Sequence, residues 1–114
     1  SWPRLQVNYQ PQGTKFEVAN TTCYNTGSGD KVLVMVSDIF GSTSGQHEAF
    51  ADTFATFGYN VYLPELLVDP YNGEMDMGKI VASIKGQDFG VMRARFEGLV
   101  KYLEEKGQKR FFVV

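Results

Sequence analysis

The residues best placed to do chemistry follow one buried segment of the chain. Residues 31–37 (KVLVMVS) form a nearly continuous apolar run, and the carboxylate of Asp38 comes directly after it. A loop with two glycines, Gly41 and Gly45, then leads to residue 46. A loop that leaves a buried parallel strand lies at the carboxyl edge of the sheet, so we expect the segment that begins at Asp38 to lie there.

Two further side chains, Cys23 and His47, could act in nucleophilic catalysis. Such a site needs a base within hydrogen-bonding reach of the nucleophile, and a third group that orients the base. His47 is expected on the first turn of a helix, where a histidine is usually a packing or surface group, so we expect no catalytic role for it. As the one cysteine in the chain, Cys23 cannot form an internal disulfide.

The composition excludes several classes of partner. The 114 residues suffice for one small domain and are 43% hydrophobic and 21% charged, a normal globular balance. Eleven basic against thirteen acidic residues give a net charge of −2, which argues against binding a nucleic-acid backbone. No apolar run approaches the roughly 20 residues that span a bilayer, so no membrane partner is expected. We expect a cytoplasmic protein, with an organelle matrix as the alternative.

After residue 30, the hydrophobic pattern predicts alternating strands and helices. The run at 31–37 and a short strand at 60–63 flank a helix over 47–57. A second helix over 88–106 leads to a third strand at 110–114. The stretch between residues 64 and 88 reads as a long loop, with a weak helical tendency near 76–85. The predicted class is α/β.

Several side chains receive structural interpretations. The helical spacing of Phe50, Phe54 and Phe57 predicts that these rings belong to the core. Arg93 and Arg95 fall away from the apolar stripe of the second helix, and we expect both to be solvated.

The segment 32–67 resembles the dienelactone hydrolase family. Four separate pieces carry this resemblance, in the family's order and spacing: Asp38-Ile39-Phe40-Gly41, Ala51-Asp52, Gly58-Tyr59 and Pro64-Glu65-Leu66. The helix at 88–106 and the strand at 110–114 also fall where the family has them. The resemblance therefore covers residues 30–114.

The resemblance implies a partial α/β-hydrolase fold, with a mostly parallel sheet and helices on both faces. Residues 1–114 would form the amino-terminal part of a single domain, with an extended arm and early strands in 1–30 and strand-helix-strand-helix-strand in 31–114. In the family, the third of these strands leads into a Gly-x-Cys-x-Gly elbow that carries the nucleophile. We therefore expect the fold to be truncated before this elbow and before the rest of the triad. Cys23 precedes the buried run, so it does not match the family's nucleophile.

The resemblance also implies a hydrolase of carboxylic esters or lactones that needs no cofactor and no metal, and whose nucleophile is a Cys or a Ser. The backbone N–H of Ile39 would form half of the oxyanion hole. Asp38 occupies the position of the family's acidic residue, usually Glu, which contacts the nucleophile. Because aspartate is one methylene shorter, bracing of the loop is an equal alternative for Asp38. The fragment alone would be inactive.

Two other interpretations stay open. The stretch Ser42-Thr43-Ser44-Gly45-Gln46 also resembles the phosphate loop of flavodoxins, which would make the chain an FMN-binding protein. Alternatively, the chain is a non-catalytic hydrolase-fold subunit of a larger assembly. In either hydrolase reading, the apolar edge at 111–114 would be covered by the missing carboxyl-terminal part or by another chain.

Overall fold

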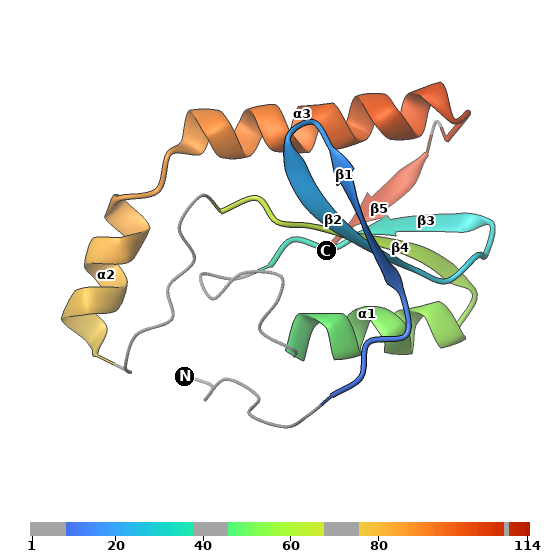
Figure 1. Ribbon diagram of the computed structural model, residues 1–114, viewed down its shortest axis with the longest axis horizontal. Helices are drawn as coiled ribbons and strands as arrows, with labels where there is room; N and C mark the ends of the chain where they lie inside the picture. Colours follow the sequence, from blue (N-terminus) through green and yellow to red (C-terminus); the bar gives the residue numbers. More distant parts are fainter. Residues whose placement is uncertain (1–8, 38–45, 68–75, 109) are drawn as a thin grey trace.

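Five strands and three helices build the part of the chain that the computed structural model describes, residues 9–37, 46–67, 76–108 and 110–114. The strands are β1 (Thr14–Val18), β2 (Thr21–Thr26), β3 (Lys31–Val34), β4 (Tyr59–Pro64) and β5 (Phe111–Val113). The helices are α1 (Gln46–Thr56), α2 (Met77–Lys85) and α3 (Phe89–Glu105). Figure 1 shows the sheet with α1 and α3 beside it and α2 at one end of the molecule.

The five strands form one sheet in the order β1-β2-β4-β3-β5. β3 lies inside this sheet, parallel to β4 on one side and to β5 on the other. These placements confirm the α/β class and the interior position predicted for the apolar run. The expectation of a mostly parallel sheet is wrong for the described strands, because β1–β2 and β2–β4 pair antiparallel. The sheet is mixed.

The antiparallel part begins with a tight hairpin. Val18 pairs with Thr21, so Ala19 and Asn20 alone connect β1 to β2. Both connecting residues have positive φ angles, 51° and 62°, as a two-residue turn of type I′ requires. Such a turn matches the right-handed twist of the strands and lets β2 pair antiparallel with β1. The predicted early strands of residues 1–30 are therefore this hairpin, which extends the sheet beyond β4.

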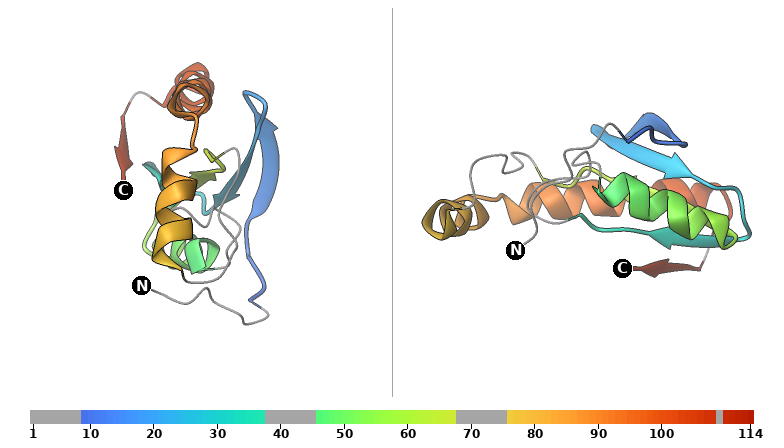
Figure 2. Two further views of the ribbon diagram at one scale, coloured as in Figure 1. Left: turned by 90° about the vertical axis from the view of Figure 1, so that its left-hand side faces the viewer. Right: turned by 90° about the horizontal axis from the view of Figure 1, so that it is seen from below.

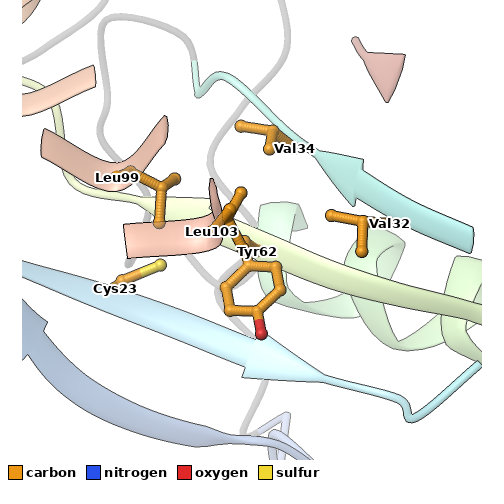
Figure 3. Packing of buried hydrophobic residues seen from close by; sticks show 6 residues of the cluster. All are labelled: Cys23, Val32, Val34, Tyr62, Leu99 and Leu103. Atoms are coloured by element: carbon orange, nitrogen blue, oxygen red, sulfur yellow. The ribbon is translucent and has the colours of Figure 1, made fainter. Parts of the chain in front are cut away.

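Helices cover both faces of the sheet, as predicted. Side chains of a strand alternate between the faces, so Val32 and Val34 face α3 while Leu33 and Met35 face α1. Figure 2 shows α1 and α3 on opposite sides of the strands. The cluster under α3 is seen in Figure 3 and consists of Cys23, Val32, Val34, Tyr62, Leu99 and Leu103.

The buried face of α1 differs from the prediction. Phe50 and Phe57 are 50% and 73% exposed, so the assignment of these two rings to the core is wrong. The helix instead buries Glu48, Ala51 and Asp52. The polar contacts of these two acidic residues, described below, lie on the buried face of the helix, whereas Phe50 lies on its exposed face and Phe57 follows its last residue.

The stretch predicted as a long loop contains α2. Asp76 caps its first turn, accepting a hydrogen bond from the Lys79 N–H, and Gly86 follows its last residue. No residue of α2 is buried, and its apolar residues Val81 and Ile84 are exposed. The predicted second helix corresponds to α3, which Asp88 caps in the same way.

Candidate functional site

The carboxyl ends of the three parallel strands meet at one edge of the sheet. Val34 at the end of β3 is level with Tyr62 of β4 and with Val113 of β5. Beyond the strand, the Met35 N–H donates to the Tyr62 carbonyl at 2.8 Å, and the Val36 N–H donates to the Val114 carbonyl at 2.8 Å. The Val114 N–H donates back to Val34 at 3.0 Å. The backbone two residues before Asp38 is thus fixed beside the end of β5.

The predicted site residues Asp38 and Ile39 lie outside the described residues, so their roles stay predictions. The structure does place the segments on either side of them. Residues 35–37 continue β3 past the sheet edge, and α1 begins at Gln46. The connection that carries both residues therefore starts next to Val114 and ends at the amino terminus of α1.

Cys23 lies in the core between the sheet and α3 (Figure 3). Burial raises the pKa of its thiol to about 12, so the thiolate that would attack a substrate is not populated near neutral pH. This burial agrees with the expectation that Cys23 is not the nucleophile. His47 is half-buried on the first turn of α1. Within the described ranges, no group of three His, Cys, Asp or Glu side chains is arranged to hold a metal ion.

Arg95 has a structural role that its sequence position did not predict. Its Nη1 donates to the carbonyl oxygens of Glu65, Leu66 and Leu67, at 3.3, 3.4 and 3.1 Å. The expectation that Arg95 is merely solvated is therefore wrong: the long side chain reaches from α3 across to the segment that follows β4. Arg93 is exposed, as expected, and its Nε lies 3.5 Å from Glu97.

Replacing Arg95 by methionine is expected to lower the free energy of unfolding by about 1–3 kcal/mol, because three carbonyls lose a charged donor. Hydrogen exchange at residues 66 and 67 should also accelerate. Urea denaturation and amide exchange measure the two effects. The matched control is Arg93→Met, where an exposed ion pair contributes about 0–1 kcal/mol. Equal effects of the two substitutions would contradict the role given to Arg95.

A buried carboxylate, Asp52, forms the densest polar cluster among the described residues. The side chain of Asp52 accepts hydrogen bonds from the Tyr9 hydroxyl, the Gln12 N–H at 3.0 Å and the Tyr24 hydroxyl at 2.6 Å. The residue is only 5% exposed. From the sequence, Asp52 was recognised only as part of the Ala51-Asp52 pair of the family motif. Its position beside Ala51 on the apolar side of a helix was the signal that it needed buried partners.

The hydrogen bonds keep this carboxylate ionised. Burial alone raises the pKa of Asp52, but the donors Tyr24, Tyr9, Gln12 and Thr26 outweigh it and hold the pKa below its ordinary value of 3.8. The stability that this group contributes is therefore complete above about pH 4 and is lost as the pH falls through the lowered pKa. At neutral pH, Asp52 is therefore an ionised carboxylate that links α1 to β2 and to residues 9–12.

These features define an α/β protein whose mixed sheet presents three parallel carboxyl ends beside a strand-to-helix connection. In the part of the chain that the structure describes, none of the helices has the length and apolar character needed to cross a membrane.

The fold is similar to the crystal structure of a putative dienelactone hydrolase from Klebsiella pneumoniae subsp. pneumoniae MGH 78578, with a TM-score of 0.62 at 18% sequence identity. The similarity covers 82% of this chain and 42% of that chain, so the chain spans less than half the length of this neighbour. The resemblance predicted from the motifs is thereby confirmed at the level of the fold. No protein-family model and no curated protein matches the sequence.

The sheet offers no support for the flavodoxin alternative. The parallel strands β4-β3-β5 suit both folds, but flavodoxins continue as an all-parallel sheet. Here an antiparallel hairpin follows β4 instead. Of the loop that resembles a phosphate loop, residues 42–45 lie outside the described residues.

Proposed function

We propose that this chain forms the amino-terminal part of a hydrolase of carboxylic esters or lactones of the dienelactone hydrolase type. The observation that carries the proposal is the pairing of residues 34–36 with Val114 at the carboxyl edge of the sheet. A nucleophile on residues that follow β5 would stand next to the connection that carries Asp38 and Ile39. This neighbourhood is what acyl transfer needs, since a carbonyl must meet the nucleophile and the oxyanion donors at once.

In this proposal, the backbone N–H of Ile39 stabilises the oxyanion of the tetrahedral intermediate. A backbone donor suits this task because it is fixed before charge develops, and one such donor contributes about 3–4 kcal/mol to the barrier reduction. Asp38 either contacts the nucleophile or braces the connection. The nucleophile is a Cys or Ser of the whole protein, and no metal or organic cofactor is required for this chemistry.

We further propose that additional polypeptide of the same hydrolase covers the outer edge of β5. Phe112 is 60% exposed and Val114 is also exposed, and no described strand pairs with this side of β5. The opposite edge strand, β1, carries the charged residues Lys15 and Glu17, which discourage pairing with another strand. β5 has no such protection, so its edge is suited to continuation of the sheet.

The proposal predicts that the 114-residue chain alone does not hydrolyse p-nitrophenyl esters, because the nucleophile is not on it. A whole protein that extends beyond β5 should hydrolyse them. The matched variant is Asp38→Ala, made in both proteins. Turnover by the 114 residues that is lost in this variant would overturn the proposal, as would a folded whole protein without esterase or lactonase activity.

A further inference from the structure

Residues 9–13, here called the strap, lie against helix α1 and strand β2. Three polar contacts attach the strap, and all of them lead to one carboxylate, two directly and the third through Tyr24. The Tyr9 hydroxyl and the Gln12 N–H both donate to Asp52 Oδ2. The Gly13 N–H donates to the Tyr24 hydroxyl at 2.7 Å, and that hydroxyl donates to Asp52 Oδ1 at 2.6 Å. In Figure 1 the blue segment that precedes β1 passes α1.

Gly13 packs so closely against β2 that the strap has little freedom to shift at this residue. A Cβ atom on Gly13 would stand 2.2 Å from the Asn25 carbonyl oxygen and 2.8 Å from the Tyr24 ring. No side chain can occupy that space without a shift of the backbone. The strap is therefore held by close packing and a hydrogen bond at Gly13, and by the hydrogen bonds of Tyr9 and Gln12 to Asp52.

Asp52 can hold all these donors only as an anion. A carboxylate offers about four acceptor sites, whereas a protonated acid gives up acceptor capacity and adds a donor. A proton on either oxygen of Asp52 would face donors that already point at that oxygen: the Tyr9 hydroxyl and the Gln12 N–H at Oδ2, or the Tyr24 hydroxyl at Oδ1. Loss of the charge thus breaks or reverses one of these bonds and weakens the others, because they no longer end on an anion.

Other charged groups near this cluster do not replace Asp52. Glu48 is buried one helical turn before it, and Lys15 of β1 lies 3.6 Å from Glu48 Oε2. The two carboxylates therefore share one face of α1, but the hydrogen bonds to the strap end on Asp52. Tyr9 shows the same preference: the hydrogen bond to Asp52 is the main reason why its pKa is raised to about 12.

We propose that Asp52 is a positioning residue that fastens the strap to α1, and that the strap detaches as a unit from an intact sheet when this carboxylate is neutralised. Asp52 belongs to α1, while its partners belong to the strap and to β2, so it also fixes the helix against the hairpin. Because α1 begins where the connection carrying Asp38 ends, strap release would loosen one anchor of the proposed oxyanion site. That catalytic consequence rests on the proposed function, whereas release of the strap does not.

The test uses hydrogen exchange and tyrosine titration by NMR on the full 114-residue chain. In Asp52→Asn, the amides of Gln12 and Gly13 should exchange at least tenfold faster, while the amides of β3 change less than twofold. The pKa of Tyr9 should fall from about 12 toward its ordinary value of 10. The control on the same helix, Thr53→Ala, should change neither readout, since Thr53 is exposed.

A second variant separates the attachment of Gly13 through Tyr24 from the direct attachment of Gln12 to Asp52. Tyr24→Phe removes the acceptor of the Gly13 N–H but leaves the bond from Gln12 to Asp52, so exchange should accelerate more at Gly13 than at Gln12. Should Asp52→Asn fail to fold, acid titration of the unaltered chain replaces it. Protection of Gln12 and Gly13 should then disappear as the pH falls through the pKa of Asp52, which lies below its ordinary value of 3.8, while β3 stays protected. Unchanged exchange in the strap, or an equal loss of protection in strap and sheet, would overturn the proposal. These readouts are independent of hydrolytic activity.

Discussion

Replacing Ile39 by proline is expected to lower kcat for ester hydrolysis by the whole protein about 10²–10³-fold, the loss seen when one oxyanion donor is removed. Proline has no backbone N–H, so the substitution deletes the proposed donor itself and no side-chain change can compensate. KM should change less than kcat, because the donor acts on charge that develops in the transition state. Steady-state kinetics with a p-nitrophenyl ester measure both constants.

The control for this substitution is Ile39→Val, which keeps the N–H and shortens the side chain by one methylene. It should retain most of the activity. Since proline also restricts the residue before it, circular dichroism and thermal unfolding must show that the variant keeps its fold. If Ile39→Pro hydrolyses the ester at the rate of Ile39→Val, the backbone of residue 39 is not an oxyanion donor.

Leu99→Ala is expected to cause the largest loss of stability among the substitutions considered, about 2–5 kcal/mol. Leu99 is fully buried on α3, where its side chain packs with Cys23, Val34 and Leu103 (Figure 3). Alanine removes buried methyl groups and leaves a cavity, because α3 cannot move closer to the sheet at one point alone. Urea denaturation measures the change in the free energy of unfolding.

The matched control is Val81→Ala on α2, which removes apolar atoms from an exposed position. Its effect should stay within about 0.5 kcal/mol, as for other surface substitutions. A small loss in Leu99→Ala, close to that of the control, would mean that α3 is not packed on the sheet as described.

The strand at the centre of the sheet could be predicted from the sequence because it is buried on both faces. A continuous apolar run between turn residues is typical of a strand inside a parallel sheet. Helices α1 and α3 were predicted because their apolar residues recur at helical spacing. In β3 and α3 the local pattern and the tertiary environment agree, so the sequence was sufficient there.

The position of the hairpin turn and the orientation of α1 could not be predicted, for different physical reasons. The turn uses Ala19 and Asn20 at positive φ, and alanine is unusual there, so the usual Asn-Gly or Asp-Gly signal is absent. In α1, the phenylalanines suggested one buried face, but the partners of Asp52 come from residues 9–26. A buried carboxylate needs these distant donors, and helical spacing carries no information about them.

The candidate site was predicted from the motif rather than from visible catalytic groups. Asp38 and Ile39 were selected because they follow the buried run in a pattern that resembles a hydrolase family. Their roles stay predictions, and the pairing of Val36 with Val114 shows only that the end of β5 lies beside the backbone that precedes them. The prediction for Arg95 was wrong because the helical pattern does not reveal that its side chain binds backbone carbonyls of residues 65–67.

Mapping the acyl group after reaction of the whole protein with a slowly hydrolysed ester tests the location of the nucleophile most directly. Peptide mass spectrometry should find the acyl group on a Cys or Ser a few residues after β5, with accumulation slowed in Ile39→Pro. Acylation of Cys23, or of a residue distant in sequence from the end of β5, would contradict the proposed site.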